Sequence, residues 1–193
     1  LLYWRSFTHW LGGMGVLVFL LAVVSVSKGA GYSLHLLRAE SPGPDVGKMT
    51  PKLKQSAKIL YIIYICLTVI EIILLLAGGM PVFDSLCTAF GTAGTGGFGI
   101  KNDSITSYSH YIQTVVTIFM ALFGINFNLY FLLLMRSWKA ILHDEELWGY
   151  IGIMVGSIVL ITINIAPIFQ YNWGEALHQS AFQVSSVMTT TGF

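Results

Sequence analysis

Four apolar stretches, at residues 10–26, 59–77, 111–135 and 148–169, constrain the fold more than any other feature of this sequence. A helix of about 20 apolar residues crosses a hydrocarbon layer of roughly 30 Å, and each stretch approaches or exceeds that length. Only 10% of the residues are charged, whereas a soluble domain carries about 25%. The sequence therefore predicts an all-α, multi-pass protein of the plasma membrane.

The distribution of positive charge predicts how these helices are oriented. Six of the ten Lys and Arg residues lie between residues 28 and 58, and two more, Arg136 and Lys139, follow the third apolar stretch. The positive-inside rule makes the loops 28–58 and 136–147 cytoplasmic. The segments 78–110 and 170–193 then face the outside, and they contain a single Lys or Arg residue, Lys101.

Each outer segment contains a stretch that is too short and too mixed in composition to cross a membrane. Residues 83–93 are followed by the run GTGGF, and residues 174–188 by the run TTTGF. Non-helical backbone at membrane depth is tolerated only where protein buries it or where it lines a watery path. Both segments are therefore predicted to be re-entrant loops, with Asp84 capping the N-terminus of the first short helix.

Loops rich in glycine and threonine suit the chemistry of a cation filter. A ring of backbone carbonyls replaces the hydration shell of an ion that leaves water. Glycine allows the backbone angles that turn carbonyls toward one axis, and threonine hydroxyls add oxygens or tie the loop to its surroundings. The short helix before each loop would point its partly negative C-terminal end at the ion. The alternative for either loop alone is a plain turn between spans.

An internal repeat favours the filter over the plain turn. A gap-free shift of 95 residues aligns four identical pairs within the 14 residues from 85 to 98, and it also places residues 59–77 on residues 154–172. The repeated unit is a span, a re-entrant loop and a second span. The four pairs are Ser85 and Ser180, Thr95 and Thr190, Gly97 and Gly192, and Phe98 and Phe193.

Five motifs follow one another along the chain. They are WRSFTHWLGGMG at residues 4–15, RAESPGP at 38–44, GTAGTGGF at 91–98, GINFN at 124–128 and MTTTGF at 188–193. In this order they resemble the Trk/Ktr/HKT superfamily of potassium transporters, and most closely the bacterial TrkH-type membrane subunit. The resemblance implies a fold of span, pore loop and span repeats around one central pore, with filter carbonyls supplied by every repeat.

The resemblance also divides the chain and assigns the filter. It makes residues 1–27 the inner helix of a first repeat, 59–135 a complete second repeat, and 148–193 the outer helix and pore loop of a truncated third, so the chain is expected to be a fragment. Potassium would bind at Thr95, Gly96, Thr190 and Thr191. The complete filter set is Gly94, Thr95, Gly96, Gly97, Thr189, Thr190, Thr191 and Gly192. Gly97 and Gly192 match the glycine that the family places in each filter loop when it favours potassium.

The implied function is potassium uptake across the bacterial inner membrane as part of a Trk-type system. The implied partners are membrane lipid, a second copy of the subunit and a cytoplasmic nucleotide-binding regulatory subunit, with no nucleic acid. No cofactor is expected, and potassium is the transported ion. The alternative is a secondary transporter that couples an ion gradient to a small solute, for which inverted halves rather than parallel repeats are typical. The sequence leaves open whether the protein is a channel or an ion-coupled symporter.

Several other residues admit both structural and functional interpretations. No motif of a soluble enzyme is present, and the cluster at residues 144–146 lacks a base or nucleophile beside it. Glu71 lies inside the second span, and we interpret it as a protonated or hydrogen-bonded structural residue rather than an ion site. Asn126 and Asn128 could face a vestibule or bond neighbouring helices. His9 and His178 are interpreted as interfacial and structural. Three glycines are interpreted as sites of close helix packing: Gly12, Gly13 and Gly15.

Overall fold

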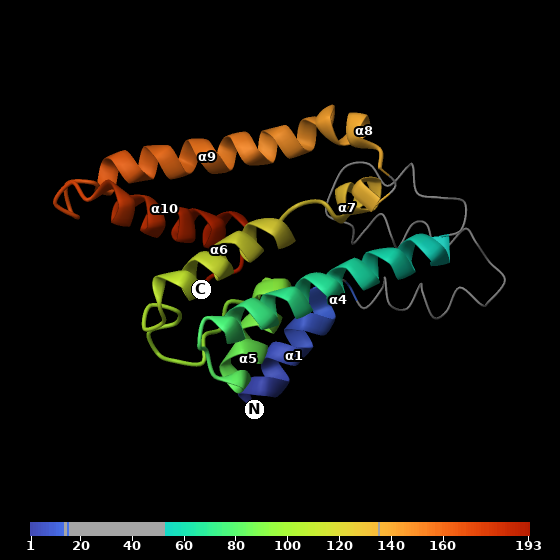
Figure 1. Cartoon of the computed structure of the whole chain (residues 1–193), viewed down its shortest axis with the longest axis horizontal. Helices are drawn as coiled ribbons and strands as arrows, with labels where there is room; N and C mark the ends of the chain where they lie inside the picture. Colours follow the sequence, from blue (N-terminus) through green and yellow to red (C-terminus); the bar gives the residue numbers. More distant parts are fainter. Residues whose placement is uncertain (14, 16–52, 135) are drawn as a thin grey trace.

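The computed structural model describes residues 1–13, 15, 53–134 and 136–193, and this part of the chain consists of helices and loops without a strand (Figure 1). The fold class expected from the sequence is thus confirmed. Most of the first apolar stretch and of the basic loop 28–58 lies outside the described residues. The helices are α1 (Leu2–Gly13), α4 (Leu53–Ala77), α5 (Val82–Ala93), α6 (His110–Phe123), α7 (Phe127–Leu134), α8 (Trp138–Leu142), α9 (Glu145–Ile165) and α10 (Trp173–Met188).

Two helices of the described part are long and apolar enough to cross a membrane. They comprise Lys58–Ala77 of α4, with a mean hydropathy of 2.8, and Glu145–Ile165 of α9, with a mean hydropathy of 1.8. Both expose large apolar side chains, such as Ile73 on α4 and Leu160 on α9, which protein does not cover. Water would make such surfaces costly, whereas lipid accommodates them. These exposed apolar faces are therefore suited to contact with lipid.

The third predicted span is not one continuous helix, contrary to the expectation for residues 111–135. Helix α6 ends at Phe123 and α7 begins at Phe127. Two backbone carbonyls at this break accept hydrogen bonds from tyrosine hydroxyls. Tyr130 donates to the Leu122 carbonyl at 2.7 Å, and Tyr150 donates to the Ala121 carbonyl at 3.1 Å. The break lies where other segments press against it, since a Cβ on Gly124 would be 2.6 Å from the Tyr150 hydroxyl.

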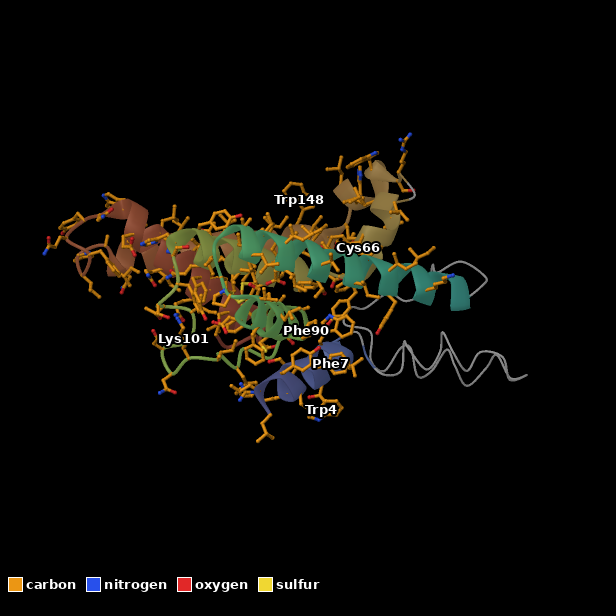
Figure 2. All side chains as sticks on the ribbon, turned by 60° about the horizontal axis from the view of Figure 1, so that its bottom comes forward. Trp4, Phe7, Cys66, Phe90, Lys101 and Trp148 are labelled. Carbon is orange, nitrogen blue, oxygen red and sulfur yellow. The ribbon has the colours of Figure 1, made fainter. Side chains whose placement is uncertain are left out.

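An aromatic cluster joins α1 to α4 and α5. The rings of Phe7 and Phe90 meet edge to face with centroids 6.0 Å apart, and Trp10 lies 5.3 Å from Phe90 (Figure 2). Polar atoms at the rim of the cluster are paired as well, because the Tyr64 hydroxyl donates to the Trp10 carbonyl at 2.8 Å and the Trp10 indole donates to the Thr68 hydroxyl at 3.2 Å. Helix α5 is thereby held between α1 and α4.

The repeat predicted from the 95-residue shift appears in the structure, with one insertion. Helix α5 ends at Ala93 and α10 at Met188, which are equivalent positions. The preceding long helices do not end equivalently, because α4 ends at Ala77 whereas α9 ends at Ile165 instead of residue 172. The connection after α9 is longer, and α10 begins earlier in the repeat than α5. The gap-free alignment is therefore correct for the short helices and wrong for the ends of the long ones.

Candidate functional site

The two candidate filter loops leave the C-terminal ends of α5 and α10 along the same backbone path. The residues that follow the helices have nearly identical angles, with φ −86° and ψ 4° at Gly94 and φ −85° and ψ 2° at Thr189. Their amides donate to the equivalent carbonyls of Phe90 and Ser185, at 3.0 and 3.1 Å. The two loops thus leave their helices with one backbone geometry, although the first residue is glycine in one loop and threonine in the other.

Both loops then turn through a threonine in the left-handed region. The φ angle is +49° at Thr95 and +57° at Thr190, which are equivalent under the 95-residue shift. A β-branched residue rarely adopts a positive φ, and it persists there only where surrounding contacts impose it. Such strain concentrates at ligand sites. Its recurrence at one position of both loops shows that the two loops share the same unusual turn.

The two loops touch each other at Gly97. The Gly97 amide donates to the Thr191 carbonyl at 2.7 Å. A Cβ on Gly97 would lie 2.5 Å from that carbonyl oxygen and would also clash with the Phe193 amide nitrogen. Because the obstructing atoms are backbone, they cannot move aside as a flexible side chain would. Glycine is therefore required at residue 97 for the loops to pack side by side.

Gly192 is required for a different reason. Open space surrounds the position that its Cβ would occupy, but its φ angle is +81°. A side chain there would fit sterically and would strain the backbone. The two glycines that the resemblance paired as filter residues are thus explained by contact at Gly97 and by conformation at Gly192.

The threonine hydroxyls of the second loop are tied into the protein. Thr189 and Thr191 are 7% and 4% exposed, and their hydroxyls lie 2.8 Å apart. The Thr189 hydroxyl donates to the Ser185 carbonyl at 2.6 Å, so Thr191 must donate to Thr189. These hydroxyls brace the loop, whereas Thr190 is exposed and Thr95 is half-buried.

Each short helix has an acidic residue in its first turn, where negative charge interacts favourably with the helix dipole. The first turn contains Asp84 in α5 and Glu175 in α10, and neither helix has a basic residue in its last turn. The loops therefore follow two partly negative helix ends that carry no basic residue of their own. The predicted capping role of Asp84 is wrong, because Pro81 is the N-cap and the Asp84 carboxylate instead accepts a hydrogen bond from the Tyr108 hydroxyl at 2.6 Å.

Helix α1 covers the inner side of the first filter loop, which sequence reasoning missed. A Cβ on Gly96 would lie 2.5 Å from His9 Nδ1, and the His9 and Phe98 rings are 5.2 Å apart. The Arg5 guanidinium lies over the Phe98 ring at 4.7 Å and donates to the Phe98 carbonyl at 3.4 Å. His9 is thus a filter neighbour. No local pattern in the sequence indicates this contact, because His9 and Gly96 lie 87 positions apart in the chain.

The glycines of α1 divide between packing and open space. A Cβ on Gly13 would meet Gly94 Cα and the Tyr64 hydroxyl, each at 2.7 Å, which confirms the close packing expected there. No described residue lies within 4 Å of that position on Gly12, so the described part of the chain gives no support to the packing interpretation there. Instead, Gly12 lines an open pocket of about 340 Å³ together with Thr8, His9, Gly13, Gly94 and Thr95.

Glu71 lies behind the first filter loop, on α4. Its side chain is 0% exposed, and neither carboxylate oxygen has a hydrogen-bond partner among the described residues. The neighbouring polar group is the Thr92 hydroxyl in the last turn of α5, which already donates to the Thr88 carbonyl at 2.9 Å. Thr92 can therefore only accept from Glu71. This arrangement suits a neutral carboxylic acid, in agreement with a structural role.

Asn126 bonds a neighbouring helix. Its side-chain amide donates to Glu146 Oε2 of α9 at 3.2 Å, at the break between α6 and α7. Of the two roles left open for this residue, the structure thus shows the interhelical bond. The side chain of Asn128 lies outside the described part.

Known proteins resemble this chain along its whole length. The profile of the TrkH family, described as a cation transport protein, matches residues 1–193. The Trk system potassium uptake protein TrkH of Salmonella typhimurium is 36% identical over 199 residues, and TrkG of Escherichia coli is 31% identical over 194 residues. Each alignment covers 99% or more of this chain and 40% of the relative. The chain thus spans about two fifths of the length of these curated relatives.

A solved structure gives the same result. The crystal structure of the potassium transporter TrkH from Vibrio parahaemolyticus superposes with a TM-score of 0.76 and 29% identity, covering 100% of this chain and 38% of that one. The apolar helices, the paired pore loops and these comparisons agree with one another. This multi-pass membrane chain belongs to the TrkH family of cation transport proteins.

Proposed function

We propose that this chain supplies two filter loops of a pore through which potassium enters the cell. The observation that carries the proposal is the meeting of two equivalent loops, each at the C-terminal end of a short helix and each turned by a threonine with positive φ. Carbonyl groups gathered in this way can replace water around a cation without a fixed charge that would trap it. The expected potassium positions are Thr95, Gly96, Thr190 and Thr191.

The choice of potassium is supported by the relatives, which are named potassium uptake proteins. A pore needs a closed ring of filter loops, whereas this chain contributes two. We assign residues 1–27, 59–135 and 148–193 to three successive repeats, with cytoplasmic loops at 28–58 and 136–147. The remaining loops then come from the rest of a protein as long as those relatives.

A pore is favoured over a solute-coupled secondary transporter by the direction of the repeats. The long helices α4 and α9 run in the same direction across the molecule (Figure 1), and the loops after both short helices meet where the Gly97 amide donates to the Thr191 carbonyl. Transporters of the alternating-access class more often use inverted halves around broken helices. Parallel units with adjacent loops suit a pore whose axis passes between them.

We further assign the protein to the bacterial inner membrane, as a homodimer regulated by a cytoplasmic nucleotide-binding subunit. The name Trk system in the relatives indicates a system of more than one component. The inner loops offer basic residues to an acidic partner, and Lys58 and Arg136 are exposed. Reversing the charges of Lys52 and Lys54 should weaken this association at low salt, where screening is slight.

The function is tested with the complete protein in proteoliposomes and in planar bilayers. Potassium uptake should occur down a potassium gradient without an added solute, and currents should reverse near the potassium equilibrium potential. The Gly152→Ser variant should transport potassium like the parent protein, because a Cβ at Gly152 of α9 would meet no described atom within 4 Å. Absence of potassium flux from a folded protein, or uptake that depends on a co-transported organic solute, would contradict the proposal.

A further inference from the structure

Three potential metal ligands meet at the end of the molecule where α6 and α10 begin. His110 is the first residue of α6, and Glu175 and His178 lie in the first turns of α10, which packs against α6 (Figure 1). One ligand atom from each residue lies within 4.8 Å of the other two. Residues three apart in a helix share a face, so Glu175 and His178 both point toward α6. By the predicted orientation, this is the outer face of the protein.

The individual distances approach those of a coordination sphere. His110 Nε2 lies 3.8 Å from Glu175 Oε2, and the two imidazole rings have centroids 4.8 Å apart. Ligand atoms around tetrahedral zinc lie roughly 3.3 Å apart, given metal bonds of about 2.0–2.1 Å. The His110 side chain is 68% exposed and is therefore free to rotate through the small remaining distance.

Thr114 determines which nitrogen of His178 carries the hydrogen. The Thr114 hydroxyl donates its one hydrogen to the His110 carbonyl at 2.7 Å, so it can only accept from His178 Nε2, which lies 3.2 Å away. The neutral ring therefore has its hydrogen on Nε2 and a lone pair on Nδ1. Among the described residues, this buried Nδ1 has no hydrogen-bond partner. Metal-binding histidines show the same division, with one ring nitrogen held by a hydrogen bond and the other free for the ion.

The two carboxylate oxygens of Glu175 likewise have different partners. Its Oε1 accepts a hydrogen bond from the Gln179 side chain at 3.2 Å, while Oε2 faces His110. Two imidazoles and one carboxylate are the ligands that zinc and related divalent ions prefer, whereas calcium and magnesium prefer oxygen alone. The donor set thus selects a transition metal.

We propose that His110, Glu175 and His178 form a binding site for a divalent transition-metal ion, with zinc as the best fit, that joins α6 to α10 at the outer face. The site is separate from the filter and does not depend on the identity of the transported ion. Because α10 leads directly into the loop at residues 189–192, a bound ion would fasten the helix that positions this loop.

Calorimetric titration of the complete, metal-free protein with Zn²⁺ tests the proposal. One Zn²⁺ per chain should bind at this site, and His110→Ala, Glu175→Gln and His178→Ala should each weaken its binding at least tenfold. Thr114→Val keeps the side-chain shape and removes the hydrogen bond to His178, so it should weaken binding about 10- to 100-fold. His143→Gln and Asp103→Asn control for the loss of one histidine and one outer carboxylate, and both should bind Zn²⁺ like the parent.

Substitution with Co²⁺ reports on coordination directly. The parent protein should show visible d–d absorption that Zn²⁺ abolishes and that all three ligand variants lack. A variant that keeps the parent melting temperature without metal is folded. If a ligand variant does not fold, Thr114→Val tests the site in its place. The proposal is overturned if the parent binds Zn²⁺ no more tightly than the folded ligand variants or Thr114→Val, or if His143→Gln and Asp103→Asn weaken binding equally.

Discussion

Replacing Gly97 by serine should separate the two filter loops and reduce the preference for potassium over sodium. The new Cβ would start 2.5 Å from the Thr191 carbonyl oxygen, whereas ordinary contact begins at 3.4 Å. The backbones must therefore move apart by about 0.9 Å, and the 2.7 Å hydrogen bond between Gly97 and Thr191 is weakened or lost.

The expected size of the effect follows from these two contacts. Overpacking a tight site costs about 1–3 kcal/mol, and the lost hydrogen bond adds about 1 kcal/mol. Half of that total of about 2–4 kcal/mol, expressed as a difference between the potassium-bound and sodium-bound filters, is about a 5- to 30-fold change in ion preference, since about 1.4 kcal/mol corresponds to a factor of ten. Displaced carbonyls replace the hydration shell of potassium less completely, so the advantage of potassium over sodium falls.

Competition between potassium and sodium for uptake into proteoliposomes measures the ratio. The complete protein carrying Gly97→Ser is compared with Gly152→Ser, which makes the same chemical change at an uncrowded glycine of α9. The control should keep the parent ratio. A Gly97→Ser protein that folds, transports and retains the parent ratio would refute the reasoning that close contact of the loops sets selectivity.

Three further predictions concern stability and topology. Burial and the hydrogen bond to Asp84 raise the pKa of the Tyr108 phenol above its usual 10.0. As the pH rises, Tyr108 therefore ionises in the unfolded chain before it ionises in the folded protein. The stability that the neutral phenol contributes is present below about pH 10 and declines above it. Tyr108→Phe should lower the free energy of unfolding by about 1 kcal/mol at pH 8 and flatten the alkaline decline in denaturant titrations. The free energy of unfolding of Glu71→Gln should lie within about 1 kcal/mol of the parent value, whereas Glu71→Lys, which buries a charge, should lower it by about 3 kcal/mol or more. Equal thermal midpoints for these two variants would contradict a neutral Glu71. In a protein without its native cysteines, an impermeant maleimide should label Lys101→Cys in intact cells and Lys58→Cys only after permeabilisation, and the reverse pattern would invert the topology.

The glycines and threonines of the loops illustrate how far sequence reasoning reaches. The pairing of Thr95 with Thr190 follows from the repeat alone, and both residues have the same unusual backbone angle. The pairing of Gly97 with Gly192 is also visible in the sequence, but the reasons for the two glycines differ. One is required by a neighbouring loop that is distant in the chain, and no local pattern records such a contact.

The roles of the histidines were decided entirely by tertiary structure. A lone histidine in an apolar sequence is normally structural, and His9 and His178 were interpreted in that way. His9 packs against Gly96, whereas His178 meets His110 and Glu175 across a helix interface. The spacing of Glu175 and His178 places both side chains on one helix face, as in a pair of metal ligands. The third residue of the proposed site, His110, lies 65 residues before Glu175 in the chain.

The sequence by itself determined the class of the protein and the positions of its two loops rich in glycine and threonine, and it predicts the orientation of the helices. These properties depend on local composition, because the lengths of apolar stretches, loop charges and runs of glycine and threonine are legible residue by residue. The tertiary structure alone decided where the third span breaks, why Gly97 must be glycine and which polar side chains meet between α6 and α10. Those features depend on contacts between segments far apart in the chain, where steric exclusion and hydrogen-bond geometry, rather than hydropathy, select the arrangement.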